Sequence, residues 1–144
     1  MKLILLLVTF FLSCQAACID KCECPKFSEL NTYGVDYKED VGCALSATCS
    51  TIGERMYIGS GWDTTEIQTK SDANLEMLVF RIYSPDTGDM MTNFGIICEN
   101  GAWYATKYPL GISYLDENDE RKENVGTPEE FNGRKSLLET VVCM

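Results

Sequence analysis

A β-hairpin is encoded in residues 96–105, which read Ile96-Ile97-Cys98-Glu99-Asn100-Gly101-Ala102-Trp103-Tyr104-Ala105. Asn-Gly tolerates the positive φ angles of a type I′ turn, whose twist matches that of the two strands it joins. With these two residues in the loop, the register pairs Glu99 with Ala102, Cys98 with Trp103, and Ile97 with Tyr104. Cys98 and Trp103 then lie on the same face of the hairpin.

Trp103 is predicted to pack inward and cover a disulfide at Cys98, because a large aromatic ring opposite a buried cysteine usually faces the core. The alternative is an exposed Trp103 that stacks on a ligand. Tyr104 and Tyr108 alternate away from Trp103. These two tyrosines are therefore the candidates for surface contacts with a binding partner.

Short strand-like runs, separated by clusters of Gly, Pro, Asn and Asp, make up most of the chain after residue 42. Their number and spacing predict an all-β fold, a small disulfide-stabilised antiparallel β-sandwich. A single helical turn is expected at Thr127-Pro128-Glu129-Glu130. Glu139 falls on the apolar face of the last strand, so we expect a bulge or twisted edge there. The predicted strands are residues 43–50, 55–58, 76–83, 93–99, 102–107, 111–115 and 136–143.

An apolar leader precedes the cysteines. Lys2, the apolar residues 3–12 and the small residues that follow are typical of a signal peptide cleaved after Ala16. The run is too short for a membrane span, which takes about 20 apolar residues. The alternative is a bacterial lipoprotein with Cys14 lipidated. The predicted organisation is a signal peptide at residues 1–16, a cysteine-rich N-terminal segment at 17–42 and a β-sandwich domain at 43–144, in a secreted, extracellular protein.

Removal of the leader would leave seven of the eight cysteines as candidates for disulfide bonds, which form in oxidising compartments. They are Cys18, Cys22, Cys24, Cys43, Cys49, Cys98 and Cys143. Three bridges use six of them. We expect the third bridge within the N-terminal cluster of positions 18, 22 and 24, so that one cysteine of this cluster is odd. The odd cysteine would link two chains in a disulfide-bonded dimer or be capped by a small thiol.

The other two bridges are expected among the four distant cysteines. Cys43 and Cys49 cannot pair with each other, because an extended strand separates them by about 20 Å and a disulfide permits about 7 Å between Cα atoms. We favour Cys49 with Cys98 and Cys43 with Cys143, and the crossed arrangement stays open.

The chain is acidic and contains no histidine. Twenty-two acidic and twelve basic residues give a formal net charge of −10, which argues against nucleic acid and anionic membranes as partners. The absence of histidine removes the commonest general base and metal ligand, so we expect no enzyme, no metal site and no cofactor. The densest acidic cluster, residues 116–120, lacks EF-hand spacing and is expected to be a solvated loop.

The cysteine framework resembles a known group of domains. Its features are a Cys-x-Cys-Pro motif at residues 22–25, a Gly-Cys-x5-Cys strand at 42–49, the run from Cys98 to Ile112 and a terminal Val-Val-Cys. Together they resemble the nematode-expanded extracellular cysteine-rich domains of unknown function, which include the domain of unknown function 281 and the six-cysteine domain. The resemblance implies an extracellular disulfide-bonded module and transfers no catalytic residue.

These observations favour a secreted binding or interaction module whose partner is an extracellular protein or a glycan. Two alternatives stay open. A structural component of an extracellular matrix or coat would form disulfide-linked multimers. A hydrolase that uses two carboxylates would lose all activity when one of them is replaced.

Overall fold

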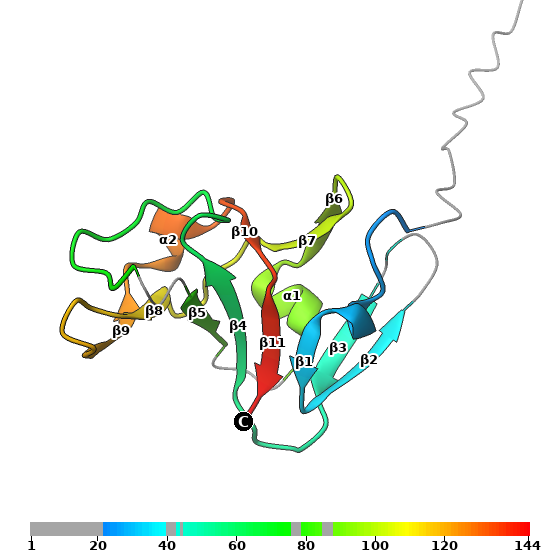
Figure 1. Ribbon diagram of the computed structural model, residues 1–144. Coiled ribbons are helices and arrows are strands. Elements are labelled where there is room, and N and C mark those ends of the chain that lie inside the picture. The colour runs from blue at the N-terminus through cyan, green and yellow to red at the C-terminus, as the bar shows by residue number, and fades with distance from the viewer. Residues whose placement is uncertain (1–21, 40–42, 44, 76–78, 85–87) are drawn as a thin grey trace, which may run out of the picture.

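A six-stranded sheet is the largest layer of the computed structural model, which describes residues 22–39, 43, 45–75, 79–84 and 88–144 (Figure 1). The predicted leader and Cys18 lie outside these residues. A three-stranded sheet and a two-stranded ribbon accompany the main sheet. Three disulfides join the described part of the chain. The predicted all-β, disulfide-stabilised fold is confirmed.

The strands are short. They are β1 (Asn31–Tyr33), β2 (Val35–Glu39), β3 (Leu45–Cys49), β4 (Met56–Gly61), β5 (Val79–Tyr83), β6 (Ile97–Glu99), β7 (Ala102–Ala105), β8 (Ile112–Leu115), β9 (Arg121–Val125), β10 (Ser136–Leu137) and β11 (Thr140–Cys143). The helical elements are a 3-10 turn, η1 (Phe27–Glu29), and the helices α1 (Met90–Phe94) and α2 (Pro128–Phe131).

Strands distant in sequence are neighbours in the main sheet, whose order is β1-β11-β4-β5-β8-β9. The three-stranded sheet has the order β10-β7-β6, and β2 pairs with β3 in the ribbon. Among the strands of the described residues, every pair is antiparallel except β1 with β11, which is parallel. The last strand of the chain thus lies between the first strand and β4, as Figure 1 shows.

The core lies against one face of the main sheet. Ile58, Ile82 and Val141 occupy one row across β4, β5 and β11, and each is 0% exposed. Phe27 from η1 and Phe94 from α1 are equally buried in the same cluster. Alternate residues of these strands therefore point away from the core, as the period of two requires.

The strand predicted for residues 93–99 is wrong in its first half, which belongs to α1. Asp89 caps this helix by accepting a hydrogen bond from the Thr92 N–H at 3.1 Å, and Gly95 ends it at φ 56°. Met90 and Phe94, four residues apart, both face the core. The helical turn predicted at residues 127–130 is confirmed as α2.

The run predicted as one strand at 136–143 is divided into β10 and β11 by Glu139. Its carboxylate accepts hydrogen bonds from the Gly61 N–H at 3.1 Å and from the Thr64 hydroxyl at 2.8 Å. The expected departure from regular pairing at Glu139 is therefore present, because the carboxylate finds donors beside β4 instead of facing the core.

Three strands were not predicted because their sequences are polar. β2 and β9 expose most of their residues, and β1 has three residues only. Each of them is held by pairing: β1 with the distant β11, β2 with the later β3, and β9 with β8, which directly precedes it.

Gly111 offers a test of the packing between β8 and β9. Its φ is +70°, and an added Cβ would clash with the Val125 carbonyl. Gly53 has φ +92° with no atom within 4 Å of an added Cβ. Gly111→Ala should therefore lower the free energy of unfolding by at least about 1 kcal/mol more than Gly53→Ala, since only the first adds a backbone clash to the strain of positive φ. Equal losses in chemical denaturation would contradict this packing.

Candidate ligand-binding pocket

The β6–β7 hairpin has the predicted turn and register. Asn100 and Gly101 have φ angles of 52° and 80°, as a type I′ turn requires. Cys98 pairs with Trp103, and Ile97 pairs with Tyr104. Trp103 is 3% exposed, so the prediction that it packs inward is confirmed.

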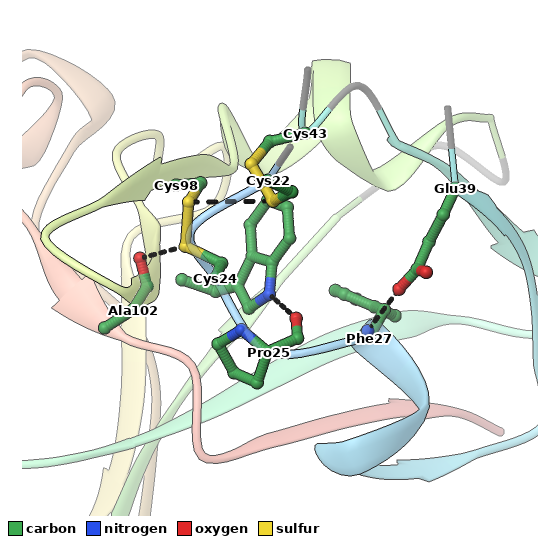
Figure 2. The surroundings of a disulfide bond; sticks show 9 residues. Cys22, Cys24, Pro25, Phe27, Glu39, Cys43, Cys98 and Ala102 are labelled. Carbon is green, nitrogen blue, oxygen red and sulfur yellow. Dashed lines mark hydrogen bonds between the residues drawn. A yellow bond between two sulfur atoms is a disulfide. The ribbon is translucent and has the colours of Figure 1, made fainter. Parts of the chain in front are cut away.

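Trp103 holds the N-terminal segment against the hairpin. Its indole N–H donates a hydrogen bond to the Pro25 carbonyl at 2.9 Å. Its ring meets that of Phe27 edge to face, with centroids 6.1 Å apart. The Phe27 N–H donates to the Glu39 carboxylate at 2.6 Å (Figure 2). Residues 24–27 therefore lie across the hairpin face that contains Cys98 and Trp103.

The favoured disulfide pairing is wrong. The structure joins Cys22 to Cys43, Cys24 to Cys98, and Cys49 to Cys143. The crossed arrangement would pair Cys49 with Cys143 and Cys43 with Cys98, and only its first bridge is present. The exclusion of a Cys43–Cys49 bridge is confirmed.

The reason for the error is the path of the N-terminal segment. Residues 22–25 cross the hairpin, so Cys24 reaches Cys98 and its neighbour Cys22 reaches Cys43 (Figure 2). The third bridge therefore does not form within the N-terminal cluster. Six cysteines are used, and the remaining cysteine of the predicted mature chain, Cys18, lies outside the described residues.

Tyr104 lines a pocket of about 330 Å³ beside the hairpin. The pocket wall combines the turn of the hairpin, the start of β10 and the loop after β4. Its lining residues are Asp63, Thr64, Thr65, Glu66, Glu99, Asn100, Tyr104 and Lys135. Tyr104 is half-buried there, so the structure places this predicted contact residue at a concave surface.

Tyr108 is 0% exposed, so the prediction of a surface contact is wrong for this residue. Its hydroxyl lies 2.6 Å from the Ser136 hydroxyl, which lies 2.7 Å from that of Thr65. The chain of three hydroxyl groups leads from the core to the pocket wall. Tyr108 thus supports the pocket from behind.

Lys135 contacts two carboxylates that line the pocket, those of Glu99 and Glu66. Its ammonium contacts the Glu99 carboxylate at 2.5 Å, and this contact raises the pKa of Lys135. Its backbone N–H donates to the Glu66 carboxylate at 2.9 Å. With Asp63, three carboxylates and one ammonium face the same pocket. Sequence reasoning missed these charged residues because they are scattered over more than 70 positions; the one local signal was the hairpin that contains Tyr104.

The described residues contain two clusters with metal-ligand spacing, Cys22–Cys43–Cys98 and Cys49–Glu54–Cys143. Every cysteine in them belongs to a disulfide. A metal requires the thiolate form of cysteine, so these clusters are by-products of disulfide packing.

The acidic cluster at residues 116–120 has a structural role at its first residue. Asp116 is 4% exposed, and its carboxylate accepts the N–H groups of Asn118 and Glu120, each at 2.9 Å. Lys122 contacts the same carboxylate at 2.8 Å and lowers its pKa. Asp116 therefore closes the β8–β9 turn.

Burial raises the pKa of Tyr108 to about 12, compared with about 10 in an unfolded chain. The unfolded state then loses this proton first, so the free energy of unfolding should fall as the pH rises from about 10 to about 12. Tyr108→Phe should reduce this fall and remove a tyrosine that ionises near pH 12 in ultraviolet titration.

Burial also raises the pKa of Tyr114 to about 12. Tyr114→Phe is therefore the companion variant, and it should remove a second late-ionising tyrosine. Loss in Tyr108→Phe of a tyrosine that ionises near pH 10, instead of near pH 12, would contradict the burial of its hydroxyl.

Comparisons with known proteins identify the family. A family model described as TRA-1 regulated protein R03H10.4 matches residues 20–143. No curated protein and no solved structure matches the chain. No helix in the described residues is long and apolar enough to cross a membrane. The expected membership of a nematode cysteine-rich group is confirmed. The match does not support the finer assignment to the domain of unknown function 281. The chain belongs to the nematode-specific, cysteine-rich family of TRA-1 regulated protein R03H10.4.

Proposed function

We propose that this protein is a secreted extracellular binding module that takes a glycan in the pocket beside Tyr104. The observation that supports this most directly is the pocket itself, about 330 Å³ in volume. Small-molecule sites range from about 300 to 1,000 Å³. The pocket is large enough for one sugar unit of a longer chain whose other units remain in solvent.

The chemistry of the pocket wall suits a ligand with many hydroxyl groups. Hydroxyl groups both donate and accept hydrogen bonds, so their site needs both kinds of partner. The carboxylates of Asp63 and Glu66 accept, while the Asn100 amide and the Lys135 ammonium supply donors. The half-buried ring of Tyr104 adds an apolar surface with a polar tip.

The pocket is also built on rigid parts of the fold. Glu99 follows Cys98, which is covalently bound to Cys24. Tyr104 is paired on both sides, with Ile97 in β6 and with Leu137 in β10. A site that is ordered before binding loses less conformational entropy when the ligand arrives.

Three disulfides support secretion, because such bonds persist in oxidising compartments and are rare in the cytosol. The signal peptide at residues 1–16 remains a prediction. A structural matrix component and a carboxylate-dependent hydrolase remain the alternative functions, and the lack of enzyme activity likewise stays a prediction.

Tyr104→Ala tests the glycan proposal. On an array of immobilised extracellular glycans, the secreted protein should bind a defined subset, and Tyr104→Ala should bind the same glycans at least about ten-fold more weakly. Tyr33→Ala is the matched control, because Tyr33 is 72% exposed and does not line the pocket. Binding to no glycan, or equal binding by Tyr104→Ala, would refute the proposal.

A disulfide-linked dimer through Cys18 is the second proposal on partners. Six of the seven cysteines of the predicted mature chain pair within it, so Cys18 has no partner among the six that are described. The secreted protein should run as a dimer in non-reducing electrophoresis, and Cys18→Ser should run as a monomer. A wild-type monomer with a capped thiol in its intact mass would contradict the dimer.

A further inference from the structure

The face of the main sheet that points away from the core displays two arginines and two tyrosines, Arg55, Tyr57, Arg81 and Tyr83, which we call the Arg–Tyr face. Tyr57 pairs with Tyr83 across β4 and β5, one residue before and after the buried Ile58–Ile82 pair. Because side chains alternate along a strand, the two tyrosines lie on the side opposite the core. They are half-buried, as is Arg81, whereas Arg55 is exposed.

The four side chains contact one another through two cation–π pairs and one pair of tilted rings. The Arg81 guanidinium lies 5.2 Å from the centre of the Tyr57 ring, and the Arg55 guanidinium lies 6.0 Å from that of Tyr83. The two tyrosine rings are 5.6 Å apart. A cation–π contact holds a guanidinium without a hydrogen-bond acceptor for its N–H groups. Both arginines are thus held in place with their donors available.

Neither guanidinium has an acceptor among the residues that the structure describes. Arg121, in contrast, pairs with Glu123 at 3.5 Å, and Arg134 donates to the Glu66 carbonyl at 3.2 Å. The contrast is informative in a chain with twenty-two acidic residues, because carboxylates are plentiful and yet none of those in the described residues pairs with these two arginines. Two neighbouring guanidinium groups without an acceptor in the described residues suit carboxylates supplied by another molecule.

An apolar surface continues from the Arg–Tyr face toward the edge of the sheet. Tyr33 and Val142 lie in the same row as Tyr57 and Tyr83. Tyr33 is 72% exposed, and Met144, whose backbone bonds to that of Arg55, is 58% exposed. Tyrosine, methionine and arginine are the residues enriched at protein–protein interfaces, and lysine and glutamate are depleted there.

A groove of about 310 Å³ borders the face on the side of β8 and β9. Arg55 and Tyr83 form one wall, and the rest is lined by Leu110, Ser113, Glu123 and Asn124. The Glu123 carboxylate forms an ion pair with Arg121. The groove therefore offers a recess next to the unpaired guanidinium of Arg55.

We propose that the Arg–Tyr face binds an acidic segment of another extracellular protein. Arg55 and Arg81 receive its carboxylates, and apolar side chains of the same segment pack on Tyr33 and Met144. The negative net charge of the chain does not prevent this, since charges are screened over about 8 Å at physiological ionic strength and the nearest groups dominate. This site shares no residue with the pocket beside Tyr104 and does not depend on the glycan proposal.

The experiment selects peptides from a random library of phage-displayed sequences on the immobilised secreted protein. The selected peptides should contain clusters of acidic residues next to an aromatic or aliphatic residue. In fluorescence anisotropy with one such peptide, Arg55→Gln and Arg81→Gln should each weaken binding by about ten-fold or more. Arg81→Lys should restore only part of the affinity, because an ammonium cannot bind a carboxylate with two parallel hydrogen bonds.

Two controls separate this site from the rest of the surface. Arg134→Gln changes the net charge equally at an exposed arginine outside the face and should leave affinity unchanged, as should Tyr104→Ala. Circular dichroism and thermal melting of each variant show that the fold is kept. The double variant Arg55→Gln/Arg81→Gln replaces surface side chains only, so loss of its binding with an unchanged melting temperature supports the site.

Four outcomes would overturn the proposal. They are selection of no acidic peptide, equal affinity of the arginine variants, binding of heparin in place of acidic peptides, and self-association of the wild type that the double variant abolishes. The third outcome would assign the face to a sulfated polysaccharide, and the fourth to a second copy of this chain.

Discussion

The attachment of the N-terminal segment to the β6–β7 hairpin is the constraint on which the rest of the structure depends. The Cys24–Cys98 bridge joins residues that are 74 positions apart, and the Trp103 indole binds the Pro25 carbonyl on the same face. In the chain-entropy model a loop of this length gives about 4 kcal/mol of stabilisation. Phe27 enters the core directly after this contact, and β1 and β2 follow from it.

Once the N-terminal segment is anchored, the sheet order places two different surfaces on one small fold. β1 and β11 come together as a parallel pair, and the Cys49–Cys143 bridge locks the ribbon to the same edge. The tyrosines and arginines of the Arg–Tyr face then lie on the outer side of β4 and β5. The charged groups that line the pocket beside the hairpin and β10 are instead mainly carboxylates. These two surfaces are the ones to which we assign the proposed glycan site and the proposed site for an acidic segment.

Local sequence signals predicted the parts of the fold that depend on neighbouring residues. The Asn100-Gly101 turn set the register of its hairpin, Thr127-Pro128 began a helical turn, and Glu139 interrupted the last strand. The polar strands β2 and β9 were missed because their stability comes from pairing, and α1 was missed because five residues show too little periodicity. Tyr108 was misplaced because alternation beyond the end of β7 no longer holds.

The amino-acid sequence by itself determined the all-β class, the inward orientation of Trp103 and the use of cysteines as covalent links, since these follow from turn chemistry, residue alternation and composition. Only the tertiary structure decided which cysteines pair and which side chains meet in the pocket and on the Arg–Tyr face. The physical reason is that these contacts join residues dozens of positions apart, and their proximity depends on strand order and chain path, which local patterns do not encode.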